Sequence, residues 1–276
     1  MKVYFPIPPN IKIENIEEKI ISSITFLNIP NNRLKSFFFK KYQDKVFLGI
    51  YQLKNKKWLL LKIKECAPLE FIEINRKQLN VNDTEIVVVV PKKSNTFEKE
   101  TMILPKPDSL KIDNSIVAQR VSLNFSFLDS CSSYQGEYPY KMSGLKKGSF
   151  LSFDSLKWIK HKNLKSFLIL MNISKDINTT DPVEIKIFNP NNKERTKIIS
   201  ANRNSYTVHE VSKYEKDFQE EIIFLTSKFC SFIPIFLSIN LKTNQLSVEH
   251  VHPPTEYFFG YGKEELVKSL KIQWIN

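Results

Sequence analysis

The sequence predicts a mainly β protein with few short helices, in which an N-terminal antiparallel β unit over residues 1–100 precedes an immunoglobulin-like antiparallel β-sandwich over residues 109–276. Three observations lead to this fold class. Runs of β-branched and aromatic residues of strand length recur along the chain, separated by polar turn segments. No long helical pattern lies between the hairpins of the second half, which favours an antiparallel sandwich over an α/β sheet. An apolar content of 42% with 25% charged residues is ordinary for a folded chain.

The first unit reads as a meander of short strands. These strands are expected over residues 37–39, 46–53, 58–63, 69–74 and 86–90. The last of them, IVVVV, has the continuous apolar character of a strand buried on both faces. Residues 15–27 leave two alternatives open, because isoleucines at spacings of three and four fit a helix, whereas the same residues also fit a strand.

Residues 92–108 are polar, carry two prolines near their end, and predict a domain boundary or a crossover. The strand expected next, over residues 117–128, alternates apolar and polar side chains. Its apolar face consists of Val121, Leu123, Phe125 and Phe127.

The second unit shows the clearer strand pattern. Strands are expected over residues 167–173, 183–188, 196–200, 206–211, 222–226, 233–240 and 247–252. Asn189 and Pro190 with the following asparagines predict the turn of one hairpin. A short helix is expected over residues 263–270.

The first candidate site lies in residues 130–153, which we expect to form a loop. Glycines are scarce in this chain, and three of the six fall in this stretch, which indicates positive φ or close backbone approach. The side chains suited to stacking on, and hydrogen bonding to, a sugar or a peptide are Tyr134, Gln135, Glu137, Tyr138 and Tyr140. The alternative is a long hairpin loop whose tyrosines close over the core.

The second candidate site lies in residues 246–262. On a strand, alternation places His250 and His252 on one face, where two imidazoles and the carboxylate of Glu256 could bind a divalent metal. A metal-dependent enzyme would then use Glu249 or Glu137 as acid or base. Over seven residues the spacing resembles the first half of the cupin metal motif, although Asn244 occupies the position of its glycine. The alternative is that these histidines are polar residues where a strand ends before two prolines.

The two candidate sites each follow a predicted strand, so in a sandwich they can emerge at the same end. We therefore expect them to form one concave surface, with Glu137 and His252 within reach of a common ligand. If the two strands are antiparallel to each other, the sites lie at opposite ends instead.

The formal net charge of +12 is carried almost wholly by lysines spread along the chain, rather than by the arginines that favour base and phosphate recognition. A nucleic-acid partner is therefore not expected. The three cysteines are too few and too widely spaced for a disulfide framework. The N-terminus lacks a signal-peptide pattern and no apolar run has membrane-spanning length, so a cytoplasmic or assembly-associated location is expected.

No P-loop, GxGxxG, GxSxG, CxxC or HExxH motif occurs in the sequence. The leading hypothesis is therefore a non-catalytic binding or structural module that binds a protein or glycan, or that belongs to an oligomer or larger assembly. The metal-dependent enzyme is the alternative from a different class, and only that alternative implies a cofactor.

Overall fold

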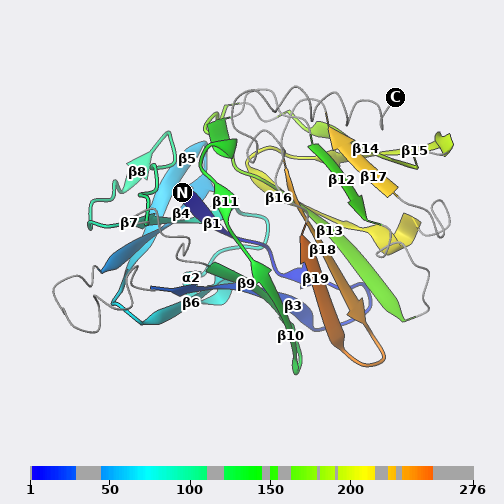
Figure 1. The fold of residues 1–276 in the computed structure, drawn as a ribbon, viewed down its shortest axis with the longest axis horizontal. Helices are drawn as coiled ribbons and strands as arrows, with labels where there is room; N and C mark the ends of the chain where they lie inside the picture. The colour runs from blue at the N-terminus through cyan, green and yellow to red at the C-terminus, as the bar shows by residue number, and fades with distance from the viewer. Residues whose placement is uncertain are drawn as a thin grey trace, which may run out of the picture. The chain divides into compact units, whose positions relative to one another are not determined.

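The computed structural model describes residues 2–28, 45–110, 121–144, 150–154, 163–178, 181–189, 192–214, 223–227 and 232–250. It is mainly β and its strand pairs are antiparallel, which confirms that part of the predicted fold class (Figure 1). The chain divides into two compact units. The first contains Met1–Ser143 and Lys175–Asn178, and the second contains Gly144–Ser174 and Thr179–Asn276.

The boundary between the units differs from the predicted one near residues 100–109, which falls inside the first unit. The reason is long-range pairing. Strand β9 (Val121–Phe127) pairs with β3 (Lys19–Leu27), and β11 (Tyr138–Pro139) pairs with β1 (Val3–Ile7). The polar segment that suggests a boundary is therefore a connection within one unit.

One sheet of the first unit has six strands in the order β11, β1, β7, β4, β5, β8. The strands not yet introduced are β7 (Val87–Lys92), β4 (Val46–Lys54), β5 (Lys57–Cys66) and β8 (Glu100–Thr101). The four valines of β7 are fully buried, which confirms the expectation that this strand is covered on both faces. A Cβ at Gly49 on β4 would clash with the present position of the Phe97 ring, so the absence of a side chain allows this close approach.

The second sheet of the first unit runs β10, β9, β3, β2, and β6 also pairs with β3. The new strands are β10 (Ser130–Gln135), β2 (Ile11–Lys12) and β6 (Phe71–Asn75). Of the alternatives for residues 15–27, the strand is correct over Lys19–Leu27. Its side chains follow a period of two, with Ile20, Ile24 and Phe26 buried while Ile21 and Leu27 are exposed.

The two sheets of the first unit pack against each other. The rings of Phe5 on β1 and Phe26 on β3 lie 5.5 Å apart between centroids. Arg76, which begins the short helix α2 (Arg76–Leu79) directly after β6, is only 1% exposed. Its guanidinium donates to the carbonyl oxygens of Ile7 and Pro8 at 3.0 and 2.7 Å, so it joins the end of β1 to the end of β6. It also donates to the carbonyls of Asn82 and Glu85.

The second unit consists of two four-stranded sheets. One sheet contains β12 (Phe150–Asp154), β17 (Ile223–Ser227), β14 (Val183–Asn189) and β15 (Asn192–Ala201), in that order. The other sheet contains β16 (Ser205–Glu210), β13 (Leu164–Asn172), β18 (Ile233–Asn240) and β19 (Gln245–His250), in that order. The strands predicted for these segments are confirmed, with ends that differ by a few residues.

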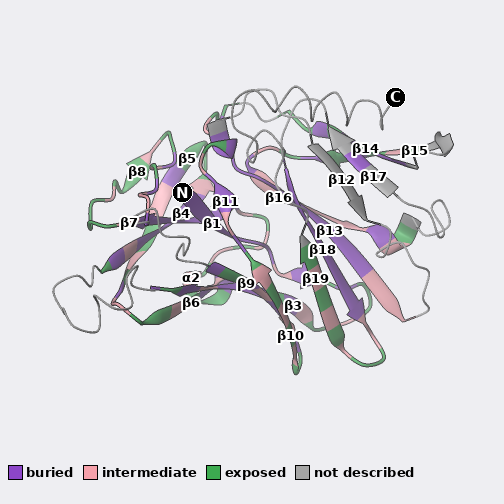
Figure 2. Cartoon of the chain, in the orientation of Figure 1, coloured by how far each residue is buried: buried purple, intermediate pink, exposed green. Residues whose placement is uncertain are grey.

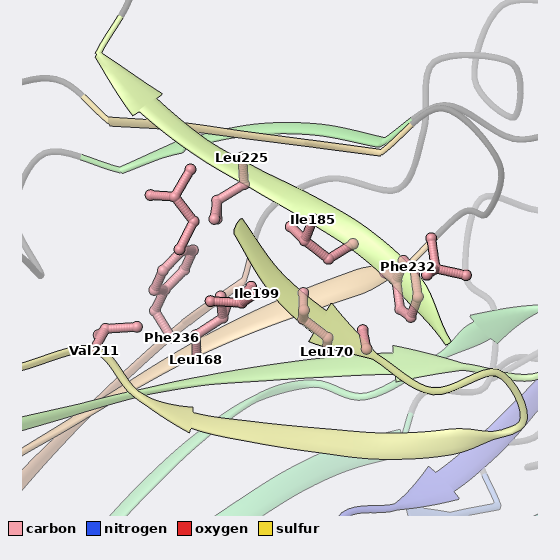
Figure 3. Packing of buried hydrophobic residues seen from close by; sticks show 11 residues of the cluster. Leu168, Leu170, Ile185, Ile199, Val211, Leu225, Phe232 and Phe236 are labelled. Carbon is pink, nitrogen blue, oxygen red and sulfur yellow. The ribbon is translucent and has the colours of Figure 1, made fainter. Parts of the chain in front are cut away.

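The core of the second unit contains side chains from both of its sheets (Figure 3). Leu168, Leu170 and Phe236 come from β13 and β18, and they cluster with Ile185 of β14 and Leu225 of β17. Burying each of these side chains contributes about 1.5–3 kcal/mol. The two antiparallel sheets of the second unit therefore share one core.

Two predicted elements, a strand over residues 37–39 and a helix over residues 263–270, lie outside the described residues. Residues 130–153 differ from the loop that we expected. Apart from residues 145–149, which lie outside the described ranges, they form β10, β11, the 3-10 turn Met142–Gly144 and β12. A hairpin with β9 orders Ser130–Gln135, because each of its residues has a partner there.

Candidate binding surface

The five residues of the predicted binding loop do not form one site. Tyr134 and Gln135 are neighbours on a strand, so their side chains point to opposite faces of the second sheet. Tyr138 is 0% exposed and belongs to the core, so it cannot contact a ligand. Tyr140 lies beside Tyr4, with 5.9 Å between ring centroids. Glu137 accepts a hydrogen bond from the side-chain amide of Gln135.

Gln135 belongs to a larger surface that sequence reasoning missed, the outer face of strands β10, β9, β3 and β6. Antiparallel register aligns its residues in rows across the sheet. One row is Gln135, Ser122, Thr25 and Glu73, and the next is Ser133, Asn124, Ser23 and Asn75. A third row is Cys131, Ser126 and Ile21. We call the residues of these three rows the polar face.

The dimensions of the polar face follow from sheet geometry. Neighbouring strands are about 4.8 Å apart, so the distance from β10 to β6 is roughly 14 Å. Successive rows are two residues apart along each strand, or roughly 6.6 Å. The polar face is therefore wide enough to contact several groups of an extended ligand at once.

Hydrogen bonds order part of the polar face. The side-chain amide of Asn124 on β9 donates to the Thr25 hydroxyl at 2.9 Å and to the Ser23 hydroxyl at 3.4 Å, both on β3. The Asn124 side chain thus bridges two rows. Because its orientation is fixed before a ligand arrives, less side-chain entropy is lost on binding.

The polar face is almost uncharged, which is unusual for a chain with 41 lysines and arginines. Glu73 is its only charged residue. Several of its side chains are exposed, among them Ser122 and Ser133, and β10 alternates between intermediate and exposed residues in Figure 2. Hydroxyl and amide groups both donate and accept hydrogen bonds, so the surface can match a neutral polar ligand.

Exposed apolar residues border the polar face where β3 meets β6. Leu27 and Phe71 are direct cross-strand partners, and they are 37% and 68% exposed. Leu69, which is 67% exposed, precedes β6, and its N–H donates to the Asn28 carbonyl. We call Leu27, Leu69 and Phe71 the apolar edge. An exposed Phe ring beside hydroxyl and amide side chains is suited to stacking on the apolar face of a ligand.

Tyr140 lies in a second polar cluster of the first unit. The ammonium of Lys175 lies 4.1 Å from the centre of its ring, and that of Lys106 lies 5.6 Å away. Tyr4 packs on the same ring, and burial raises the pKa of the Tyr4 hydroxyl well above its usual range. The Tyr4 hydroxyl is therefore neutral, and the positive charge of the cluster resides on the lysines.

The metal prediction stays a prediction. His250 ends β19 opposite Ile235, but its side chain, like His252 and Glu256, lies outside the described residues. Glu249 is exposed on β19. Among the residues that the structure does describe, no three of the types His, Cys, Asp and Glu are grouped so that they could hold a metal ion. The expected common surface of Glu137 and His252 is likewise untested.

Most side chains of the polar face are neutral hydrogen-bonding groups. Serine hydroxyls become nucleophiles when a base such as histidine takes their proton. Besides Glu73, Cys131 and Ile21, the three rows contain serines, asparagines, a threonine and a glutamine, and no histidine. Their side chains can therefore hold and orient a ligand by neutral hydrogen bonds.

Within the described ranges, no helix has the length and apolar character needed to cross a membrane. No model of a known protein family, no curated protein and no solved structure matches this chain.

Proposed function

We propose that this protein is a non-catalytic binding module that holds a neutral carbohydrate on the polar face. The observation that carries the proposal is the arrangement of hydroxyl and amide side chains in aligned rows beside the exposed ring of Phe71. Sugar hydroxyls donate and accept hydrogen bonds, as do the side chains of Ser122, Asn124 and Gln135. The C–H face of a sugar ring can stack on an aromatic ring.

The scarcity of charge supports a neutral ligand. Binding to nucleic acids and other polyanions depends on lysines and arginines that neutralise phosphates. Glu73 is the one charged residue of the polar face, and the ammonium of Lys64, which donates to the Glu73 carbonyl, offsets its charge. A neutral oligosaccharide fits both the hydrogen-bonding groups and the charge of this surface.

The test is binding of the full chain to an array of neutral oligosaccharides, followed by titration of the best ligand. Phe71→Ala and Asn124→Ala should each weaken binding at least about tenfold, or about 1.4 kcal/mol. Ile198→Ala is the matched control, because Ile198 is 56% exposed on β15 of the second unit. Binding by both variants with the affinity of the unmodified chain would refute the proposal.

A protein partner is the second candidate, because the apolar edge leaves three large apolar side chains exposed together. In this case the protein is a subunit of a larger assembly and the apolar edge is its contact. Light scattering across a concentration series should show association that Leu69→Ser together with Phe71→Ser abolishes. A chain that stays monomeric at every concentration would leave only partners of a different kind.

We also propose that the second unit is an immunoglobulin-like sandwich in which the first and last strands have exchanged places. In the immunoglobulin order, strand B pairs with A and E, and F pairs with C and G. Here β13 pairs with β16 as B does with E, and β14 pairs with β17 as C does with F. β18 occupies the place of A beside β13, and β12 occupies the place of G beside β17.

An experimental structure or cross-strand NMR contacts would test this topology. Contacts between Ser152 and Leu225 are expected from the register of β12 and β17. If β12 paired with β13 instead, the first two strands would have the usual immunoglobulin order. The proposed exchange of the first and last strands would then be wrong.

A further inference from the structure

We infer that Lys106, Lys175 and Tyr140 form a second binding site, which takes a tetrahedral oxyanion such as a phosphate or sulfate group. This site is separate from the polar face and does not depend on the proposed carbohydrate. It lies within the first unit, to which Lys175–Asn178 belong.

Three chain segments position the site. Ser143 donates from its hydroxyl to the Tyr140 carbonyl at 2.7 Å, and its own carbonyl accepts from the N–H of Lys175 at 2.8 Å. The Tyr140 N–H donates to the Lys2 carbonyl. Lys106 stands between Pro105 and Pro107, whose fixed φ keeps this segment extended. The lysine side chains thus project from anchored backbone.

The two ammonium groups are brought together by the same ring. Since they lie 4.1 and 5.6 Å from one centroid, their separation cannot exceed the sum of these distances. A cation–π contact orients an ammonium and does not neutralise its charge. The site therefore has two ordered positive charges.

Carboxylates do not neutralise these charges in the part of the chain that the structure describes. Neither Lys106 nor Lys175 forms an ion pair there, in contrast to Lys57, which pairs with Glu100. The acidic residues nearest in sequence accept backbone hydrogen bonds. Asp108 accepts from the N–H of Lys93, and Asp176 accepts from that of Asn178.

The chemistry of the site selects the type of anion. Lysine binds phosphate as a point charge, whereas planar carboxylates are matched best by the fork of arginine. The Tyr140 hydroxyl makes no hydrogen bond within the described residues, so it can donate to one oxygen of the anion. An ammonium group and the Tyr140 hydroxyl can contact separate oxygens of a tetrahedral group, and the second ammonium group adds a positive charge beside the same ring.

The test uses the 15N-labelled full chain titrated with inorganic phosphate, inorganic sulfate or acetate, at an ionic strength held constant with sodium chloride. The amide signals of Tyr140, Lys141 and Lys175 should shift and saturate with phosphate and sulfate, and should not saturate with acetate. Equal saturation by acetate would overturn the assignment to a tetrahedral anion. Shifts that grow linearly with phosphate, without saturation, would overturn the site.

Substitutions test which side chains bind the phosphate. Lys106→Met and Lys175→Met keep the aliphatic stem on the ring and remove the charge, so each should weaken phosphate binding about fivefold or more. Tyr140→Phe keeps the ring and tests the hydroxyl. Lys62→Met is the matched control, since Lys62 is an exposed lysine on β5. Circular dichroism confirms that each variant is folded, and equal affinity in the Lys106, Lys175 and Lys62 variants would refute the proposal.

Discussion

The first unit has two surfaces built by the same strand alternation from opposite kinds of side chain. On β5 the exposed residues include Lys57, Lys62 and Glu65, and pairs such as Lys45 with Glu65 at 2.5 Å form between them and neighbouring segments. On the polar face the exposed residues include Ser122 and Ser133. Interspersed charges are what solubility alone requires of a surface. An uncharged surface of this size in a basic protein needs another explanation, and ligand binding is the one that we propose.

The largest expected effect concerns Arg76, which joins the ends of β1 and β6 and so holds together the sheets that carry these two surfaces. Replacing Arg76 with alanine removes a donor from two buried carbonyls, those of Ile7 and Pro8, and from the part-buried carbonyls of Asn82 and Glu85. This should lower the free energy of unfolding by about 3 to 5 kcal/mol. Urea unfolding followed by circular dichroism measures this. Lys77→Ala in the same helix is the control. Equal urea midpoints of unfolding for the two variants would show that the Arg76 hydrogen bonds do not stabilise the contact between the ends of β1 and β6.

The reactivities of the two cysteines that the structure describes should differ, because one lies on the polar face and the other is buried. Cys131 is exposed on the polar face, whereas burial raises the pKa of the Cys66 thiol to about 11 from 9.0, and the nearby charge of Glu70 adds to this. Thiolate is the reactive form, so at pH 8 the rise lowers the reactive fraction of Cys66 about 100-fold. In a Cys230→Ser background, alkylation followed by mass spectrometry should label Cys131 first. Equal labelling rates would contradict the burial of Cys66.

Placing a lysine on the polar face would make it resemble β5. Ser122→Lys puts a strongly hydrated charge in the row between Gln135 and Thr25, and should weaken binding of a neutral oligosaccharide about tenfold. The free energy of unfolding should change little, because Ser122 is exposed. The reciprocal variant Lys62→Ser should bind normally. Calorimetric titration measures both, and undiminished binding by Ser122→Lys would remove this row from the binding surface.

The smallest expected effect concerns Glu210, which lies in the second unit. Burial alone would raise the pKa of Glu210, but hydrogen bonds and charge from Lys165, with hydrogen bonds from Ser212 and Lys213, lower it on balance. A lowered folded-state pKa stabilises the protein above the unfolded value, near 4.5, and this stability is lost as pH falls below it. Unfolding free energies from pH 7 to pH 3 should therefore decrease less steeply in Glu210→Gln, by on the order of 1 kcal/mol. An identical pH dependence in both proteins would contradict the lowered pKa.

Much of the strand pattern could be predicted from the sequence because it depends on local alternation. Val121, Leu123 and Phe125 are buried on one face of β9 as expected. The close backbone approach expected of the scarce glycines is also found. A Cβ at Gly136 would lie 2.7 Å from that of Leu123. These features can be predicted because they depend only on residues that are neighbours in the sequence or on a single contact.

The polar face could not be predicted, because no local pattern records which strands become neighbours. Its central row joins Ser23, Asn75, and the hairpin residues Asn124 and Ser133, which come from three distant parts of the chain. The same holds for Tyr138, for which the sequence left two alternatives open, a contact with a ligand or a place over the core. Pairing of Tyr138 with Tyr4 on β1 draws its side chain into the core.

The discontinuous composition of the first unit has a consequence for synthesis on the ribosome. Lys175–Asn178 belong to this unit, Ile177 is buried, and Lys175 hydrogen bonds to Ser143. Domains usually fold as units in order of emergence, beginning at the N-terminus. Here the earlier unit cannot complete its packing until the chain has been translated past residue 178, and by then β13 of the later unit is already made. A nascent chain stopped at residue 143 should consequently be more susceptible to proteolysis than one stopped after residue 178.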